Sequence, residues 1–282
     1  MTTQGMLAAR FETERAGLRG VAFRLLGSAT EADDAVQEAW LRLGRVDAGE
    51  IDNLAAWLRT VVSRVCLDML RARRADPVAE VPEEVWAGAD PAEEAVLVEE
   101  VGRALLVVLS TLSPAERVAF VLHDLFAVPF TEIAPLLDRS AATTKKLASR
   151  ARQRVRGVPP VDAEAQRHTV DAFLAAARDG DLTGLLAVLA PDVVRTADRV
   201  ALPSGPLTAR GAGTIAAETV HLGRRSRFAA VALVDGAVGV VVASRGRLTL
   251  ALTVTVVGGR ITAYDVIGEP ARLLALSLAV ID

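Results

Sequence analysis

The chain has 282 residues and a formal net charge of −3, which excludes a uniformly basic nucleic-acid coat protein but not local basic surfaces. Its single cysteine, Cys66, excludes an intramolecular disulfide and makes a cysteine-based zinc site implausible. The sequence shows no secretory leader and no apolar run of the ~20 residues that cross a bilayer, so we expect a cytoplasmic protein without a membrane partner.

The small net charge conceals strong local blocks. Residues 75–100 carry nine acidic side chains and no basic one, and three prolines interrupt the same stretch. Like charges and prolines oppose compact structure, so we predict an acidic, flexible linker over 76–92. A second break falls at Gly157-Val158-Pro159-Pro160, where a helix must stop. The predicted domains are therefore 1–75, 93–157 and 162–282.

The first domain has the apolar spacing of helices. One face of a helix is predicted from residues at steps of three and four, namely Ala32, Val36, Ala39 and Leu43. The next segment has a second stripe of this kind, made of Leu54, Leu58, Val61, Val65 and Met69. In the second domain, Ser113 followed by Pro114 predicts a helix start, because serine caps helices and proline suits their first position.

Residues 162–282 change character along their length. Two helices are predicted over 169–178 and 182–189, and a third over 211–222. From residue 227 the apolar period becomes two, and glycine turns follow at 235–236, 245–246 and 258–259. This pattern predicts a four-stranded antiparallel meander. Helices that precede such a sheet indicate an α+β domain with helices packed on one face.

Residues 130–156 are the strongest local signal for function. A short amphipathic helix over 130–137, a turn ending in the cap Ser140, and a basic helix over 141–156 make a helix-turn-helix. In such folds the second helix enters the major groove, where its side chains reach base edges and phosphates. The candidate DNA-binding residues are Thr143, Thr144, Lys145, Lys146, Ser149, Arg150 and Arg152. A solvated basic helix without a ligand is the alternative, which seven positive charges without one acid disfavour.

Two further helix faces have weaker signals. The ridge Asp33, Asp34, Gln37 and Glu38 has steps of four and suits a basic partner, although an ordinary solvated face has the same spacing. Arginines beside an aromatic residue suit single-stranded DNA, because bases stack on the ring and phosphates pair with the charges. The candidates for this role are Asn53, Trp57, Arg64, Arg71 and Arg74, and the alternative is a buried tryptophan with solubilising arginines.

Taken together, three ordered motifs resemble the extracytoplasmic-function sigma factors of bacterial RNA polymerase. Residues 31–41 (EADDAVQEAWL) resemble the region 2.2 signature, and residues 53–62 (NLAAWLRTVV) the start of region 2.3. Residues 112–122 (LSPAERVAFVL) and 147–152 (LASRAR) resemble region 4. The resemblance implies two all-α domains, a region 2 helical bundle and a region 4 helix-turn-helix.

The resemblance also implies the partners. Core RNA polymerase, through its β′ clamp helices and β flap, and promoter DNA would be bound, with no cofactor, no metal and no covalent chemistry. The acidic ridge would contact the clamp helices, Asn53 and the helix after it would capture the −10 element, and the basic helix would read the −35 element. A stand-alone helix-turn-helix regulator that never contacts polymerase is the competing function, and it leaves the first two motifs unexplained.

Residues 162–282 resemble the SnoaL-like, NTF2-type domain with a curved antiparallel sheet that is fused to the SigJ-like group of these sigma factors. The stretches that carry this resemblance are 177–186 (ARDGDLTGLL), 190–194 (APDVV) and the final hairpin. Some SnoaL-like folds are enzymes, and the acid-base candidates would be Asp192, Asp198, His221 and Asp265. Because nothing in the sequence pairs these four, we favour a regulatory domain acting in cis, with a small-molecule ligand as a further partner.

Overall fold

The computed structural model describes residues 3–46, 51–75, 102–221, 226, 228–244 and 247–281. Contacts between residues divide the described chain into two units. The first, here called the helical unit, contains α1 (Thr3–Leu26), α2 (Ala29–Leu43), α3 (Leu54–Ala75), α6 (Pro114–Phe120), η3 (Val121–Leu125), α7 (Phe130–Leu136) and most of α8 (Ala141–Arg156). The second, the α+β unit, contains α5 (Arg103–Thr111), the end of α8 and everything after it. The predicted linker 76–92 lies outside the described residues.

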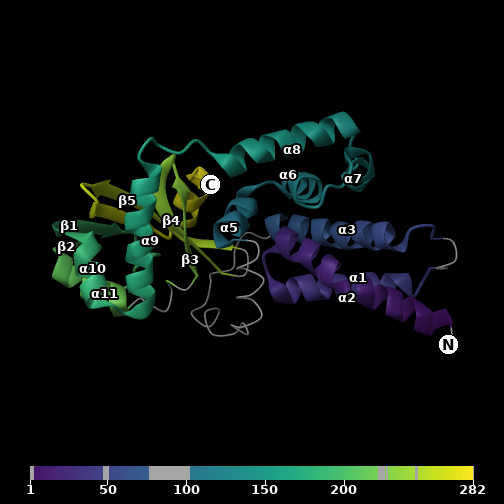
Figure 1. The fold of residues 1–282 in the computed structure, drawn as a ribbon, viewed down its shortest axis with the longest axis horizontal. Coiled ribbons are helices and arrows are strands. Elements are labelled where there is room, and N and C mark those ends of the chain that lie inside the picture. The colour runs from purple at the N-terminus through teal and green to yellow at the C-terminus, as the bar shows by residue number, and fades with distance from the viewer. Residues whose placement is uncertain are drawn as a thin grey trace. The chain divides into compact units, whose positions relative to one another are not determined.

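Helices α1, α2 and α3 pack against one another as a bundle (Figure 1). The predicted stripe on α2 is confirmed, since Ala32, Val36, Ala39 and Leu43 are all buried. The predicted stripe on α3 is buried at Leu54, Leu58 and Val65 but only half-buried at Val61 and Met69. The burial of α3 extends instead to Val62, Cys66, Leu67 and Leu70, because a helix in contact with several neighbours buries more than one narrow stripe.

The helix-turn-helix is present as predicted. Ser113 caps α6 in a complete capping box with Glu116, and Pro114 occupies the first turn. Helix α7 begins at Phe130, which confines Pro135 to the last residues of a short helix. The turn that follows places Asp138 at a positive φ of 53°, and the Ser140 hydroxyl accepts a hydrogen bond from the Thr143 backbone N–H at 3.2 Å. These two features reverse the chain and start α8.

The α+β unit is built on a seven-stranded sheet in the order β2-β1-β6-β5-β4-β3-β7. Its strands are β1 (Leu189–Ala197), β2 (Thr208–Arg210), β3 (Ala229–Val234), β4 (Ala237–Ser244), β5 (Arg247–Val257), β6 (Arg260–Ile267) and β7 (Leu278–Ala279). The helices that accompany it after α8 are α9 (Ala163–Asp179), α10 (Leu182–Val188), α11 (Ala212–His221) and α13 (Pro270–Ala275). The predicted α+β class and the meander β3-β4-β5-β6 are confirmed.

The sheet is mixed rather than wholly antiparallel, because β1 pairs with β6 in parallel. This corrects the expectation of an antiparallel sheet. Strand β1 begins at Leu189, directly after α10, and contains Pro191 and Asp192, two residues that are rare in strands. Sequence periodicity therefore gave no sign of the strand, whose pairing depends on β6 some 70 residues further on.

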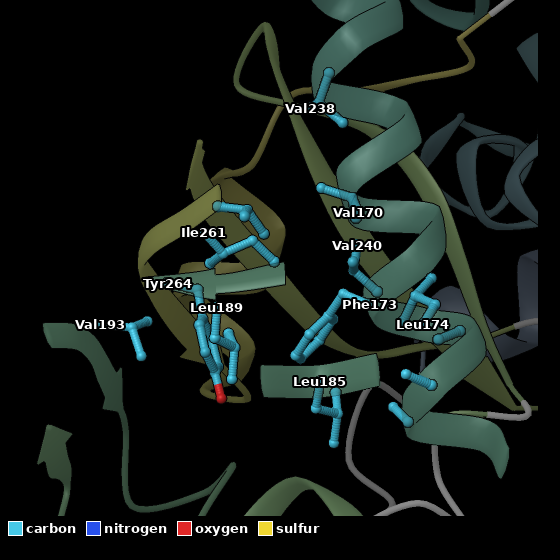
Figure 2. Packing of buried hydrophobic residues seen from close by; sticks show 14 of the residues in the cluster. Val170, Phe173, Leu174, Leu185, Leu189, Val193, Val238, Val240, Ile261 and Tyr264 are labelled. Carbon is cyan, nitrogen blue, oxygen red and sulfur yellow. The ribbon is translucent and has the colours of Figure 1, made fainter. Parts of the chain in front are cut away.

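Helix α9 packs against β3, β4 and β6 and supplies Val170, Phe173 and Leu174 to the core (Figures 1 and 2). Helix α5 packs on β3, β4, β5 and β7, so the first described helix after the predicted linker belongs to this unit by its contacts. The end of α8 is also joined to the sheet. The Val280 N–H donates a hydrogen bond to the Val155 carbonyl at 2.8 Å, just before the predicted helix stop at Gly157.

Candidate nucleic-acid and polymerase interfaces

The outer face of α8 gathers basic and hydroxyl side chains from two consecutive turns. Lys145, Lys146, Ser149 and Arg150 are all exposed, and steps of three and four place them next to one another. No acidic residue occurs between positions 139 and 156, so the field of this face is positive. Thr143 lies at its edge, half-buried, with its hydroxyl 2.9 Å from that of Ser140. A face of this composition is suited to a polyanion.

Thr144, predicted to contact DNA, is on the opposite side of α8. Its side chain is fully buried and its hydroxyl donates to the Ser140 carbonyl at 3.0 Å. The residue continues the inward stripe of Ala148, Ala151 and Val155 at steps of four, three and four. That spacing was available in the sequence and marks Thr144 as a core residue, so the prediction for this one position is wrong.

Arg152 has a second role besides the predicted one. Its Nε and Nη2 atoms lie 2.7 and 2.6 Å from Oδ1 of Asp124 on η3. Both side chains are partly shielded, at 37% and 18% exposure, so the pair is stronger than an average surface ion pair. Arg152 therefore orients α8 against η3, and only part of its guanidinium remains available to a phosphate.

The predicted single-strand face on α3 is partly assembled. Asn53 accepts a hydrogen bond from the Ala56 N–H at 3.0 Å and so caps the helix. Trp57, Arg64 and Arg71 follow at steps of seven, which places them in one row along the helix. Trp57 is half-buried, and both arginines are exposed, with Arg71 3.8 Å from Asp68. The side chain of Arg74 lies outside the described residues.

Behind α3 lies a buried cationic residue that the sequence did not reveal. Arg117 of α6 is 3% exposed, and its Nε and Nη2 atoms have no hydrogen-bond partner among the described residues. Burial, and then the charge of Arg73, lower its pKa to about 9. The neighbouring Cys66 thiol is buried as well, which raises its pKa to about 12. The contact between α3 and α6 therefore places a cationic side chain, with two nitrogen atoms unpaired among the described residues, inside the helical unit.

The acidic ridge on α2 is exposed at Asp33, Asp34 and Gln37, and half-buried at Glu38. The Asp33 carboxylate accepts hydrogen bonds from Nε and Nη2 of Arg19, at 2.7 and 3.0 Å. Glu38 forms an ion pair with Arg42 at 2.8 Å. Leu41, which the sequence analysis did not name as a functional residue, is 50% exposed and lies one helical turn beyond Gln37 and Glu38. A single exposed leucine is ordinary on a protein surface, so only its place beside the ridge connects it with a protein partner.

Family models match two segments of the chain. The model of Sigma-70 region 2 matches residues 11–75, and that of Sigma-70, region 4 matches residues 102–155. The probable ECF RNA polymerase sigma factor SigI of Mycobacterium tuberculosis is 33% identical over 292 aligned positions, which cover 97% of each chain. The chain belongs to the extracytoplasmic-function sigma factors.

A second relative of this sigma factor is the ECF RNA polymerase sigma factor SigJ of M. tuberculosis, 43% identical over 204 positions that cover 68% of this chain and 65% of SigJ. The crystal structure of SigJ aligns with 94% of this chain and 98% of its own, at 34% identity and a TM-score of 0.47. As a member of the family, the protein binds core RNA polymerase and promoter DNA and directs promoter-specific transcription initiation. Sigma factors are in general not enzymes, and a stand-alone regulator is not favoured.

The acid-base candidates of the α+β unit have structural partners. Asp198 accepts hydrogen bonds from the N–H groups of Ala201, Gly268 and Glu269, at 2.8 to 2.9 Å. Burial alone would raise the pKa of Asp198, but these hydrogen bonds and the charge of Arg272 hold it below its ordinary value. Asp265 binds Arg272 at 2.6 Å and Thr196 at 2.6 Å. His221 has Nδ1 3.0 Å from the Ala217 carbonyl oxygen, while Asp192 is exposed.

Membrane-spanning helices and clustered metal ligands are both absent from the residues that the structure describes. No helix there is long and apolar enough to cross a membrane. In the same residues, no three His, Cys, Asp or Glu side chains are grouped so that they could hold a metal ion.

Proposed function

We propose that the outer face of α8 reads the −35 element of the promoter. The observation that carries this proposal is the row of exposed side chains Lys145, Lys146, Ser149 and Arg150 over the first turns after the Ser140 cap. In helix-turn-helix proteins these turns lie in the major groove, where ammonium and guanidinium groups bind guanine edges and phosphates. Arg152, held by Asp124, would set the angle of the helix on the duplex.

For the −10 element, we propose the row Asn53, Trp57, Arg64 and Arg71, with Arg74 as its continuation in sequence. A half-buried tryptophan offers a stacking surface for an unpaired base, and the two exposed arginines suit the phosphates on either side.

The β′ clamp helices of the polymerase are proposed to bind the acidic ridge on α2. The residues in this contact would be Asp34, Gln37 and Leu41, with Asp33 and Glu38 beside them. The β flap would be contacted from region 4, and the protein would act in the cytoplasm.

The α+β unit is proposed to be a non-enzymatic module that modulates initiation in cis. Support comes from α5 and the end of α8, which precede and follow the helix-turn-helix in sequence and both pack with the sheet. A structural change in the sheet would therefore reach α5 and the end of α8, which lie on either side of the DNA-reading residues in sequence. For the same reason, deletion of residues 162–282 is a poor test, because it would strip α5 and Val155 of their partners.

Run-off transcription with core polymerase and a promoter selected from genomic DNA tests the proposal. Lys145→Ala combined with Lys146→Ala should lower initiation about 30-fold, from roughly 1 kcal/mol for each lost contact to a base edge or phosphate. Arg210→Ala with Arg247→Ala removes two exposed charges from the α+β unit and is the matched control, with no loss expected. Equal loss in both double variants would show that net charge, rather than this helix, drives promoter binding.

Binding to core polymerase is measured separately by fluorescence titration. Asp34→Ala with Gln37→Ala should weaken it about tenfold, while the lysine double variant leaves it unchanged. If neither wild-type protein nor variant associates with purified core polymerase, the competing regulator function replaces this proposal.

A further inference from the structure

The α+β unit encloses a cavity of about 520 Å³. This volume lies in the range of roughly 300–1,000 Å³ that is typical of small-molecule sites. Its walls come from α9, α11 and the strands β1, β4, β5 and β6, all of them within the same unit. Most of the lining is apolar, with Phe173, Ala177, Val240, Leu250, Leu252 and Val266 prominent.

The apolar wall is formed by side chains that the core leaves partly uncovered. Leu250, Leu252 and Val266 are only half-buried although they lie on central strands of the sheet. Phe173 projects from α9 toward Tyr264, with the ring centroids 5.9 Å apart (Figure 2). Half-buried leucines on central strands lose packing contacts that a bound molecule would restore.

One end of the cavity is polar. Arg195 on β1 is 5% exposed, and its Nη2 lies 2.6 Å from Oε2 of Glu218 on α11. Its Nη1 donates to the Pro206 carbonyl at 2.9 Å. The Tyr264 hydroxyl hydrogen-bonds the Thr219 side chain and is close enough to feel the charges of Arg195 and Glu218. Burial raises the pKa of Tyr264, so the phenol stays protonated. Because the Thr219 hydroxyl donates its own proton to the Ile215 carbonyl at 2.8 Å, the Tyr264 proton is used in the hydrogen bond to Thr219.

The charges at this end already cancel. Glu218 neutralises Arg195 directly, so an anionic ligand would meet a carboxylate and a cationic ligand would meet a guanidinium. Among the described residues, the hydrogen bonds of Arg195 to Glu218 and Pro206 use two of its five N–H groups. The remaining Arg195 donors suit an uncharged acceptor oxygen.

We propose that this cavity binds a neutral, largely apolar small molecule that carries one acceptor oxygen, such as a carbonyl, directed at Arg195. The binding itself is independent of promoter recognition. Its effect on transcription rests on the proposed cis regulation, and the two are separated below by measuring binding and initiation on the same full-length protein.

The probe is Nile red, a neutral and mainly apolar dye with a ring carbonyl, titrated into the full chain and followed by its fluorescence. Leu252→Trp fills the cavity from the sheet, and Ala177→Leu fills it from α9. Each should weaken dye binding at least about tenfold. Leu274→Trp on α13, at a position 88% exposed, adds the same side chain outside the cavity and should leave binding unchanged. Far-UV circular dichroism confirms that each variant is folded.

The charge argument has its own test. The anionic dye 1-anilinonaphthalene-8-sulfonate should bind wild-type protein about tenfold more weakly than Nile red. Glu218→Gln leaves Arg195 uncompensated and should raise the affinity of the anionic dye about tenfold, with little change for Nile red. Tyr264→Phe removes a hydroxyl that is bonded to Thr219 rather than to the ligand, so it should leave Nile red binding nearly unchanged.

Three results would overturn the proposal. They are no Nile red binding to the wild-type protein, Nile red binding by Leu252→Trp and Ala177→Leu that is as tight as that of the wild type, and tighter binding of the anionic dye than of Nile red by the wild type. If Nile red binds as expected while run-off transcription is the same with and without it, the cavity is a ligand site and the proposed cis regulation fails.

Discussion

Helix α8 and the α+β unit use arginine and lysine in opposite ways. On α8, Lys145, Lys146 and Arg150 stand exposed along one face without an acidic residue in the helix. In the α+β unit, Arg195 is buried beside a cavity and its charge is cancelled by Glu218 at 2.6 Å. The first arrangement keeps charges hydrated until a polyanion replaces the water and counterions. The second excludes long-range attraction and leaves shape and hydrogen bonding to select a ligand.

Arg117 follows neither pattern, since it is buried like Arg195 but lacks a carboxylate partner at its Nε and Nη2 atoms among the described residues. The three positions show that the environment, rather than the residue type, decides what a basic side chain contributes. Four substitutions test how the environment of a residue decides its contribution.

Gly157→Ala tests the junction at which α8 ends and joins the sheet. Gly157 has a φ of +54°, and a Cβ there would lie 2.5 Å from the Ala279 Cβ and 2.9 Å from the Leu233 Cδ1. Strain in the left-handed region adds to this overlap, so the α+β unit should lose about 3 kcal/mol of stability in urea unfolding. Gly236→Ala, also at positive φ but with open space around it, is the control. It should lose only the stability that corresponds to backbone strain, without the part that corresponds to steric overlap. Equal losses would mean that the contact with β7 does not constrain α8.

Arg117→Met should stabilise the helical unit by about 1–2 kcal/mol at pH 7.5. Methionine keeps much of the side-chain volume and removes a buried charge, and such replacements are often stabilising. Arg117→Lys retains the charge and serves as the control, with no gain expected. Because burial lowers the pKa of Arg117 to about 9, the folded wild type releases this proton before the unfolded chain does. The extra free energy of unfolding of Arg117→Met over wild type should therefore shrink as the pH rises above about 9. A variant less stable than wild type at every pH would contradict the prediction and show that a polar partner binds Arg117.

Asp198→Asn should cost about 1 kcal/mol at pH 7. The three backbone N–H groups bond both carboxylate oxygens of Asp198, whereas an amide has one acceptor oxygen and turns its NH2 group toward a remaining N–H donor. The pKa of Asp198 is lower in the folded state than the ordinary value of 3.8. Its stabilisation is therefore complete above about pH 4 and is lost as the pH falls through the folded-state pKa. Thermal melts from pH 7 to pH 2.5 should show wild type and variant converging in acid. A constant gap would assign the loss to packing.

Thr144→Val should cost about 0.5 kcal/mol, the value of one hydrogen bond to the Ser140 carbonyl less the gain from burying a methyl group. Initiation per folded molecule should not change, whereas Ser149→Val on the exposed face should lower it. Melting curves and run-off transcription on the same preparations distinguish the two positions. A loss of promoter selectivity in Thr144→Val would return this residue to the DNA-reading set.

Much of the architecture followed from local patterns. The Ser113 and Ser140 caps, the stop at Gly157 and the glycine turns of the meander depend on neighbours within a few residues, so the sequence predicts them well. The parallel strand β1 and the short β7 escaped prediction because their partners lie far along the chain. Thr144 was misplaced because residue type was weighed above its spacing from Ala148 and Ala151.

The sequence of this sigma factor sufficed to predict the family, the main helices, the four-stranded meander and the helix on which basic charge is displayed. Those properties depend on residue type and short-range spacing, which a linear string contains. Only the tertiary structure decided which charges are exposed, which are paired and which are buried without a partner, and that the α+β unit holds a cavity with a neutral polar end. Burial and pairing depend on residues that folding brings together, such as Arg195 with Glu218 and Arg117 with Cys66.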